Sequence, residues 1–266
     1  MAKRAALYAR IIERIFTQRF RKGMNSLEFD REDIVTEAQE LGQQPPKNLG
    51  DVLYSFRYRS RLPDAILATC PAGKEWIIRG IGEARYRFVL VPLTSIAPRQ
   101  GLAEIKIPDA TPEIVARYSL SDEQALLAKL RYNRLLDIFT GLATYSLQSH
   151  LRTKISGNQI ETDELYVGIG KTGGQFILPV QAKGGTDRLG RVQLEQDLAM
   201  CASRFPQLCC RAIAAQFMED EVIALFELTI DRKDCVRFVD ERHYRLVPAD
   251  EISDEELREV ARARPS

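Results

Sequence analysis

The stretch ETDELYVGIGKTGGQFILPVQAK, residues 161–183, contains two apolar segments joined by the glycine-containing turn KTGG. Such a connection between segments of strand-like alternation is typical of an antiparallel hairpin. Polar residues stand at the ends away from the turn, Glu161 and Asp163 on the first segment and Gln181 and Lys183 on the second. The stretch therefore predicts that carboxylate, amide and ammonium groups meet at one edge of a sheet.

These residue types suit the hydrolysis of phosphodiesters. Oxygen ligands bind Mg²⁺, which stabilises charge on a scissile phosphate and lowers the pKa of a bound water. A lysine beside that water favours hydroxide and offers positive charge to the developing anion. Glycines, Arg188 and Arg191 follow Lys183 and are expected to hold phosphates. The alternative interpretation is a solvated strand edge whose polar side chains reach water.

The hairpin resembles the active-site element of the PD-(D/E)XK, or restriction-endonuclease-like, superfamily through the motif D-x17-Q-x-K of Asp163, Gln181 and Lys183. The resemblance covers roughly residues 119–230. It implies Mg²⁺-dependent cleavage of DNA, with Mn²⁺ as a substitute, and a metal bound by Asp163, Gln181 and the backbone carbonyl of Ala182. It also assigns a place facing the site to two glutamines on the following helix, Gln193 and Gln196.

The sequence departs from that family in three respects. Gln181 stands where most members have a carboxylate, so another acid is needed to restore the lost negative charge. Strand parity favours Glu161 for this role, and Glu164 and Glu195 are further candidates. No proline precedes Asp163, and we predict two strands between the flanking helices where the family core usually has three.

Residues 1–92 predict three helices followed by short strands. The helices are expected within residues 5–20, 30–42 and 45–60, the last two capped by Asp30 and Asn48, and the strands within 65–70, 75–82 and 84–91. This order resembles a winged helix-turn-helix, whose third helix lies in the DNA major groove and whose hairpin touches the backbone. The candidate DNA contacts are Lys47, Asn48, Ser55, Arg57, Arg59 and Arg61. The alternative is a packed helix end with solvated arginines.

The rest of the chain divides into a linker, residues 93–118, and a nuclease domain, residues 119–266. The strongest helical pattern runs through residues 120–151 with Ser121 as its N-cap, and a second helix is expected at 190–205. Strands follow within 208–218, 222–230 and 236–247, and an acidic helix closes the chain. The predicted fold class is α/β, an α+β mixed sheet with a restriction-endonuclease-like core and an N-terminal winged-helix-like domain.

Composition excludes several other classes. The 266 residues are 45% hydrophobic, and no apolar run approaches the roughly 20 residues that span a bilayer, so we expect a cytoplasmic protein without membrane contact. Five cysteines lack C-x-x-C spacing, which argues against a zinc ribbon. The two histidines, His150 and His243, are read as ordinary residues, and no nucleotide cofactor is expected.

Charge is unevenly distributed along the chain. Residues 1–100 carry 17 Lys and Arg against 11 Asp and Glu, and the remainder carries 21 against 26. A basic first part beside a carboxylate-rich second part favours a DNA-binding module joined to a metal-dependent one. The sequence thus predicts a Mg²⁺-dependent endonuclease of double-stranded DNA, most simply a dimeric type II restriction enzyme. The alternatives are a structure-specific repair or recombination nuclease and a non-catalytic winged-helix regulator.

Overall fold

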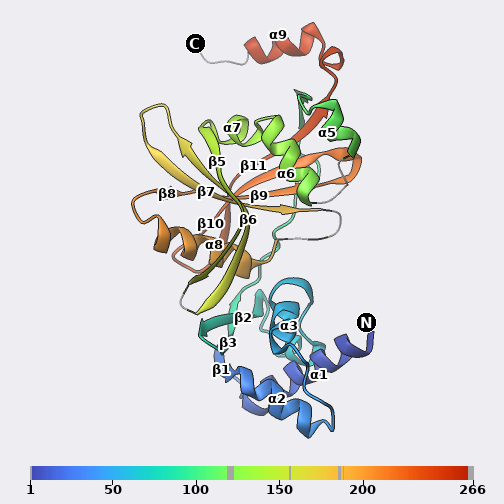
Figure 1. The fold of residues 1–266 in the computed structure, drawn as a ribbon, viewed down its shortest axis with the longest axis vertical. Coiled ribbons are helices and arrows are strands. Elements are labelled where there is room, and N and C mark those ends of the chain that lie inside the picture. Colours follow the sequence, from blue (N-terminus) through green and yellow to red (C-terminus); the bar gives the residue numbers. More distant parts are fainter. Residues whose placement is uncertain (1, 119–122, 156, 185–186, 188, 263–266) are drawn as a thin grey trace.

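Two separate sheets organise the chain in a computed structural model that describes residues 2–118, 123–155, 157–184, 187 and 189–262. The N-terminal unit, residues 2–92, holds a three-stranded sheet, and the C-terminal unit holds an eight-stranded mixed sheet with helices (Figure 1). This confirms the mixed α/β class. No helix in the described ranges is both long and apolar enough to cross a membrane.

The N-terminal unit contains the expected helices and hairpin. Its helices are α1 (Ala2–Arg19), α2 (Arg31–Glu40) and α3 (Leu49–Tyr54), and a π-helical turn (Ser55–Arg59) extends α3. Strands β2 (Lys74–Gly82) and β3 (Arg85–Pro92) pair as an antiparallel hairpin. Asp30 and Asn48 stand at the predicted N-caps, where the Asn48 side chain accepts a hydrogen bond from the Gly50 amide. Phe16, Trp76 and Phe88 pack edge to face in the core of this unit.

Two predictions for the N-terminal unit are wrong. The segment at residues 65–70 is not a strand, because Pro63 and Asp64 begin the short helix α4 (Asp64–Leu67). Strand β1 (Ser26–Asp30) was not predicted, since it is only five residues long. It pairs with β3, which gives the sheet order β1-β3-β2.

The large sheet has the order β4-β11-β10-β9-β7-β6-β5, with β8 paired to β7. In chain order its strands are β4 (Glu104–Pro108), β5 (Ala143–Ile155), β6 (Asn158–Ile169), β7 (Gln175–Lys183), β8 (Cys209–Cys210), β9 (Ala212–Phe217), β10 (Ile223–Ile230) and β11 (Val236–Val247). Strands β5, β6 and β7 form an antiparallel meander, whereas β7 and β9 are parallel. The helices of this unit are α5 (Glu113–Tyr118), α6 (Glu123–Tyr132), α7 (Leu135–Thr140), α8 (Arg191–Arg204) and α9 (Asp254–Arg262).

The long helix predicted over residues 120–151 is the main error in the C-terminal unit. The helical segment breaks at Arg134, which has a left-handed backbone (φ 50°), and α7 ends at Gly141 (φ 69°). The following residues form strand β5, so three strands rather than two lie between α7 and α8. The predicted cap Ser121 lies outside the described residues. The segment predicted as a linker, residues 93–118, contains β4 and α5.

Helices cover both faces of the large sheet. Leucines of α6 and α7 pack on one face against Leu178, Ile213 and Leu225. Helix α8 packs on the other face, where Met200 contacts the group that contains Leu165 and Ile177. Alternate residues of each central strand therefore face opposite helices, and polar side chains near the strand ends come close to α6 or α8.

Candidate functional site

The predicted hairpin is formed by β6 and β7. Their pairing runs from Ile169 opposite Gln175 to Glu164 opposite Val180. Beyond that last pair, Asp163 Oδ2 accepts a hydrogen bond from the Ala182 amide at 2.9 Å. Because Asp163 reaches across to β7, its carboxylate lies at the position that the sequence pattern predicted, beside residues 181–183.

A group of three charged side chains, which we call the carboxylate–lysine cluster, gathers at this point. Lys183 Nζ donates to Glu123 Oε1 of α6 at 3.0 Å and lies 3.7 Å from Asp163 Oδ2. The Lys183 and Asp163 side chains are only 11% and 14% exposed, whereas Glu123 is 39% exposed. Two carboxylates and one ammonium leave the cluster with a formal charge of −1 and a side open to solvent.

The electrostatics of Asp163 follow from this arrangement. Burial raises the pKa of Asp163, and the Glu123 carboxylate raises it further. Lys183, the Ala182 amide and the nearby His150 oppose that shift by favouring the ionised form. A buried carboxylate that lacks sufficient positive charge is one that a bound cation would stabilise.

Gln181 faces helix α8 instead of the cluster. Its Nε2 donates to Asp197 Oδ2 at 3.0 Å and to the Glu161 backbone carbonyl at 3.1 Å. Asp197 also accepts a 2.5 Å hydrogen bond from the Thr162 hydroxyl. Burial is the main cause that raises the pKa of Asp197 to about 7, and Asp163 contributes in the same direction. Since the Gln181 NH₂ group is directed at acceptors, only its carbonyl oxygen is suited to a metal.

Several other residues predicted for the site lie apart from the cluster. Glu161 pairs with Arg152 on β5 at 2.8 Å, so strand parity did not bring its carboxylate to Lys183. Glu164 is buried toward α6 and pairs with Arg131. Glu195 binds Arg79 and Arg191. The two glutamines on α8 have structural contacts, Gln193 with the Gly190 amide and Gln196 with the Tyr58 hydroxyl.

The predicted DNA-contacting residues divide by exposure. Lys47, Arg59 and Arg61 are exposed, and Arg59 lies over the Tyr54 ring. Asn48 caps α3, and Ser55 donates to the Asp51 carbonyl, so both side chains are engaged within the helix.

Two of the arginines predicted to contact DNA are half-buried or buried, and a third lies outside the described residues. Arg57 is half-buried and lines a pocket beside Arg191 between the two units. Arg191 is 5% exposed and bonded to Glu195 and Asp234, so its guanidinium is engaged within the protein. Arg188 lies outside the described residues.

Three residues at or beside the site were missed by the sequence analysis. Glu123 stands in the first turn of α6, and Asp197 stands one helical turn after Gln193, the residue expected to face the site. His150 on β5 lies opposite Asp163, because its neighbours Ser149 and Leu151 pair with Glu164 and Thr162. Acids in the first turn of a helix are common, so Glu123 carried no distinct signal. His150 was hidden because its strand was read as helix.

Only two carboxylates of the cluster are available to a divalent cation. The described residues contain no group of three or more His, Cys, Asp and Glu side chains that could hold a metal ion. Two carboxylates, Asp163 and Glu123, nevertheless lie around one ammonium group. Mg²⁺ is usually bound by one or two carboxylates together with waters and substrate phosphates. These two residues are therefore the ones that could hold it.

Comparisons with known proteins give no relative to guide the interpretation. The chain matches no protein-family model, no curated protein and no solved structure. The functional argument therefore depends on the geometry of the site.

Proposed function

We propose that this chain is a Mg²⁺-dependent DNA endonuclease. The observation that carries the proposal is the position of Lys183 Nζ, between Glu123 and Asp163 and beside the Ala182 amide, at the point where β6 and β7 stop pairing. Acidic oxygen ligands next to a lysine are the groups that metal-assisted phosphodiester hydrolysis requires. The negative net charge of the cluster would attract a divalent cation and would repel a phosphate group that has no bound cation.

Each residue of the site would have a separate role in hydrolysis. Asp163 and Glu123 would hold Mg²⁺, which when bound supplies Lewis-acid stabilisation of the phosphate. Lys183 would orient the attacking water, and its ammonium charge would favour hydroxide, with the released proton passing to solvent, and stabilise charge on the phosphate oxygens. The Ala182 amide fixes Asp163, and Asp197 fixes Gln181 through a buried hydrogen bond. These contacts hold the reacting groups before substrate arrives.

The order of elements around the site supports a restriction-endonuclease-like core. Helices α6 and α7, the meander β5-β6-β7, helix α8 and the parallel strand β9 follow one another, with Asp163 on the second strand of the meander and Lys183 on the third. Three strands between the helices remove one of the departures noted from the sequence. Glu123 supplies the additional acid that Gln181 requires.

The N-terminal unit supports a role in DNA recognition. Its order of α1, β1, α2, α3, β2 and β3, with the sheet order β1-β3-β2, is consistent with a winged helix. Lys47, Arg59 and Arg61 are available to contact DNA near the helix that would enter the major groove. A recognition module joined to a nuclease suits a sequence-specific type II restriction enzyme acting as a homodimer on double-stranded DNA.

Cleavage of plasmid DNA tests the catalytic proposal. The wild-type protein is expected to cut DNA with Mg²⁺ and not with EDTA. Lys183→Ala should lower the cleavage rate by roughly 10²- to 10³-fold, because the positive charge that favours hydroxide and stabilises the phosphate oxygens is lost. Lys171→Ala is the matched control, since Lys171 is exposed in the turn at the other end of the same hairpin. Equal rates for Lys183→Ala and wild type would refute the site.

The same assay separates the alternatives. A regulator would retard DNA in a gel and leave it intact in Mg²⁺. A restriction enzyme would give discrete fragments from a defined plasmid, whereas a repair or recombination nuclease would cut branched DNA in preference to duplex. Sequencing of fragment ends would then give the recognition sequence and cut position.

A further inference from the structure

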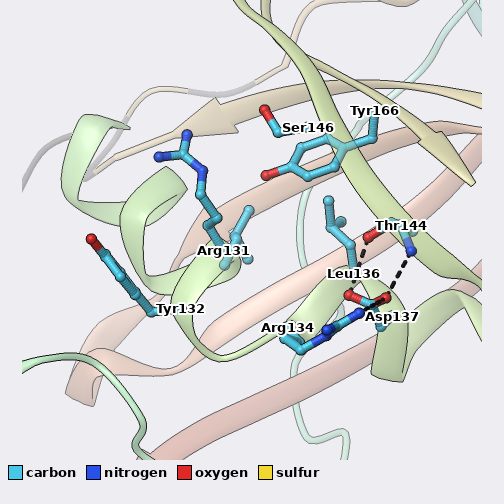
Figure 2. A pocket seen from close by; sticks show the side chains of 9 residues that line it. Arg131, Tyr132, Arg134, Leu136, Asp137, Thr144, Ser146 and Tyr166 are labelled. Atoms are coloured by element: carbon cyan, nitrogen blue, oxygen red, sulfur yellow. Dashed lines mark hydrogen bonds and ion pairs between the residues drawn. The ribbon is translucent and has the colours of Figure 1, made fainter.

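A second polar pocket lies on the α6 side of the large sheet. It has a volume of about 280 Å³ and opens between the end of α6, helix α7 and the edge strand β5. Figure 2 shows its lining, with the Tyr166 hydroxyl turned toward Arg131 and Ser146. We call it the Tyr166 pocket. It contains none of the carboxylate–lysine cluster, so the proposed cleavage does not account for it.

The pocket contains a buried polar atom that lacks a partner. Tyr166 is 4% exposed, and its hydroxyl has no well-aligned hydrogen bond within the described part of the chain, although the Arg131 guanidinium and the Glu164 carboxylate lie close enough to interact with it. Glu164 Oε2 likewise has no hydrogen-bond partner within the described residues, although Glu164 Oε1 accepts from Arg131 and Ser146. Buried polar groups are nearly always satisfied, so an unsatisfied hydroxyl facing a cavity indicates that a ligand or water supplies the partner.

The charges of the pocket argue against an isolated anion. Arg131 is paired with Glu164 at 2.8 Å, and Arg134 is paired with Asp137 at 2.8 Å. The two positive charges are therefore balanced within the wall. A phosphate would find hydrogen-bond donors there but no net positive charge, and the buried Glu164 carboxylate would oppose it.

The remaining lining suits a flat heteroaromatic ring. Leu130 and Leu136 form a buried apolar floor, and the exposed Tyr132 offers a ring on which another ring can stack. The half-exposed Arg131 guanidinium and the Tyr166 hydroxyl provide adjacent donors for a pair of ring acceptors. Such a pair is what the guanine O6/N7 edge presents to an arginine. The volume lies at the lower end for ligand pockets, which fits one base and no larger group.

The pocket is also placed to meet the substrate. Helix α6 begins at Glu123 and reaches Arg131 eight residues later, which is about 12 Å along the helix. On β6, Tyr166 lies three residues beyond Asp163, about 10 Å along the strand. His150 lies beside the cluster, and the side chains of β5 between the pocket and His150 are mostly exposed. A strand held at the cluster could therefore reach the pocket within a few nucleotides.

We propose that the Tyr166 pocket receives one unstacked nucleobase of the DNA strand, with guanine as the preferred base, a few nucleotides from the scissile phosphate. This inference rests on the proposed nuclease function for the identity of the substrate. Removing a base from its stack costs free energy, and that cost is smallest in unpaired or mismatched DNA. The pocket would thus favour substrates with an unpaired base near the cut.

Binding of free deoxynucleosides to the full-length protein in EDTA tests the pocket without any cleavage. Saturation-transfer NMR should show saturable binding of deoxyguanosine that inorganic phosphate does not displace. Tyr166→Phe should weaken it about 3- to 10-fold, the effect of one hydrogen bond. The variant should unfold at nearly the same denaturant concentration as wild type, because the lost hydroxyl has no well-aligned hydrogen bond among the described residues. Tyr145→Phe, on the exposed face of β5, is the matched control and should bind as wild type does.

Three results of the nucleoside experiment would overturn the inference: no saturable deoxyguanosine binding, displacement by phosphate, or equal affinity of Tyr166→Phe and wild type. A protein that binds deoxyguanosine through Tyr166 but cuts no DNA would refute the nuclease and retain the pocket. The reverse result would retain the nuclease and refute the pocket. In the Lys183→Ala background, an oligonucleotide scanned with single abasic sites should show one position where base removal weakens binding, and Tyr166→Phe should abolish that dependence. Uniform affinity across the scan would contradict the proposal.

Discussion

Glu123 tests the proposed metal site most directly, because in that proposal it supplies the negative charge missing at Gln181. Its carboxylate is 3.0 Å from Lys183 Nζ and remains partly exposed, so it can turn toward a cation. Glu123→Gln should raise the Mg²⁺ concentration needed for half-maximal cleavage by at least about 10-fold, as expected for a weakened metal site. A Mg²⁺ titration of the cleavage rate measures this shift.

Glu161→Gln is the control for that experiment. Glu161 was the acid favoured by strand parity, yet it pairs with Arg152 on the exposed surface. Its neutralisation should leave the Mg²⁺ requirement within about twofold of wild type, because exposed ion pairs contribute little. A larger effect for Glu161→Gln than for Glu123→Gln would show that the ligand set assigned here is wrong.

Asp197 should make the stability of the protein depend on pH. Its pKa is about 7 in the folded state against an ordinary value of 3.8, because it is buried. Between these values the folded state retains a proton that the unfolded state has released, so stability is lost as pH rises toward 7. Asp197→Asn cannot ionise. Between pH 5 and 8 it should therefore gain about 3 kcal/mol of unfolding free energy relative to wild type. Urea denaturation in EDTA measures the difference, and parallel pH profiles for the two proteins would contradict the assignment.

At the scale of elements, strand β5 shows where sequence reasoning reached its limit. Leu126, Leu127 and Leu130 follow helical spacing and are buried as predicted. The leucines continue at Leu135 and Leu142, so periodicity alone extends the helix, although Arg134 and Gly141 adopt left-handed backbones that end it. Edge strand β5 has few buried side chains, so the alternation that identifies a half-buried strand is weak there. Tertiary pairing with β6 decides its structure.

The hairpin β6–β7 was predictable because its signals are local. The turn KTGG fixes the pairing register, and residues 163 and 181–183 then meet by strand geometry alone. The partners that come from helices were not predictable in this way. Glu123 and Asp197 reach the site only because α6 and α8 cover opposite faces of the sheet. No short sequence motif predicts how either helix packs on that sheet.

At the scale of the whole molecule, the two units are joined by specific contacts. Arg79 on β2 makes two hydrogen bonds to Glu195 on α8, at 2.8 and 2.5 Å. The Tyr58 hydroxyl donates to Gln196 Oε1 at 2.9 Å. Glu195 and Gln196 lie on the same helix as Asp197, which binds Gln181. Under the proposed function, DNA bound by the N-terminal unit would lie near α8, the helix that contacts the candidate site through Asp197.

The turn between β5 and β6 provides another contact between the units. A glycine-to-alanine substitution, which adds one methyl group, can test this contact. Figure 1 shows this hairpin extending toward β2 and β3. A Cβ at Gly157 would lie 2.7 Å from the Glu83 backbone nitrogen, whereas a Cβ at Gly173 would meet nothing within 4 Å. Both glycines have left-handed backbones, with φ of 80° and 83°. Alanine at either position therefore carries the same backbone strain, and only Gly157→Ala also forces the two units apart.

Gly173→Ala should lower the unfolding free energy by about 1 kcal/mol, the cost of a left-handed alanine. Gly157→Ala should lose a further ~1–3 kcal/mol, because the clash is with backbone that cannot rotate away. Urea denaturation of both variants measures the difference. The contact also limits how the units can move, so Gly157→Ala should increase proteolysis between residues 93 and 103 while Gly173→Ala does not. Equal stability and equal proteolysis of the two variants would show that the β5–β6 turn does not hold the units together, and that the junction depends on the contacts of α8 alone.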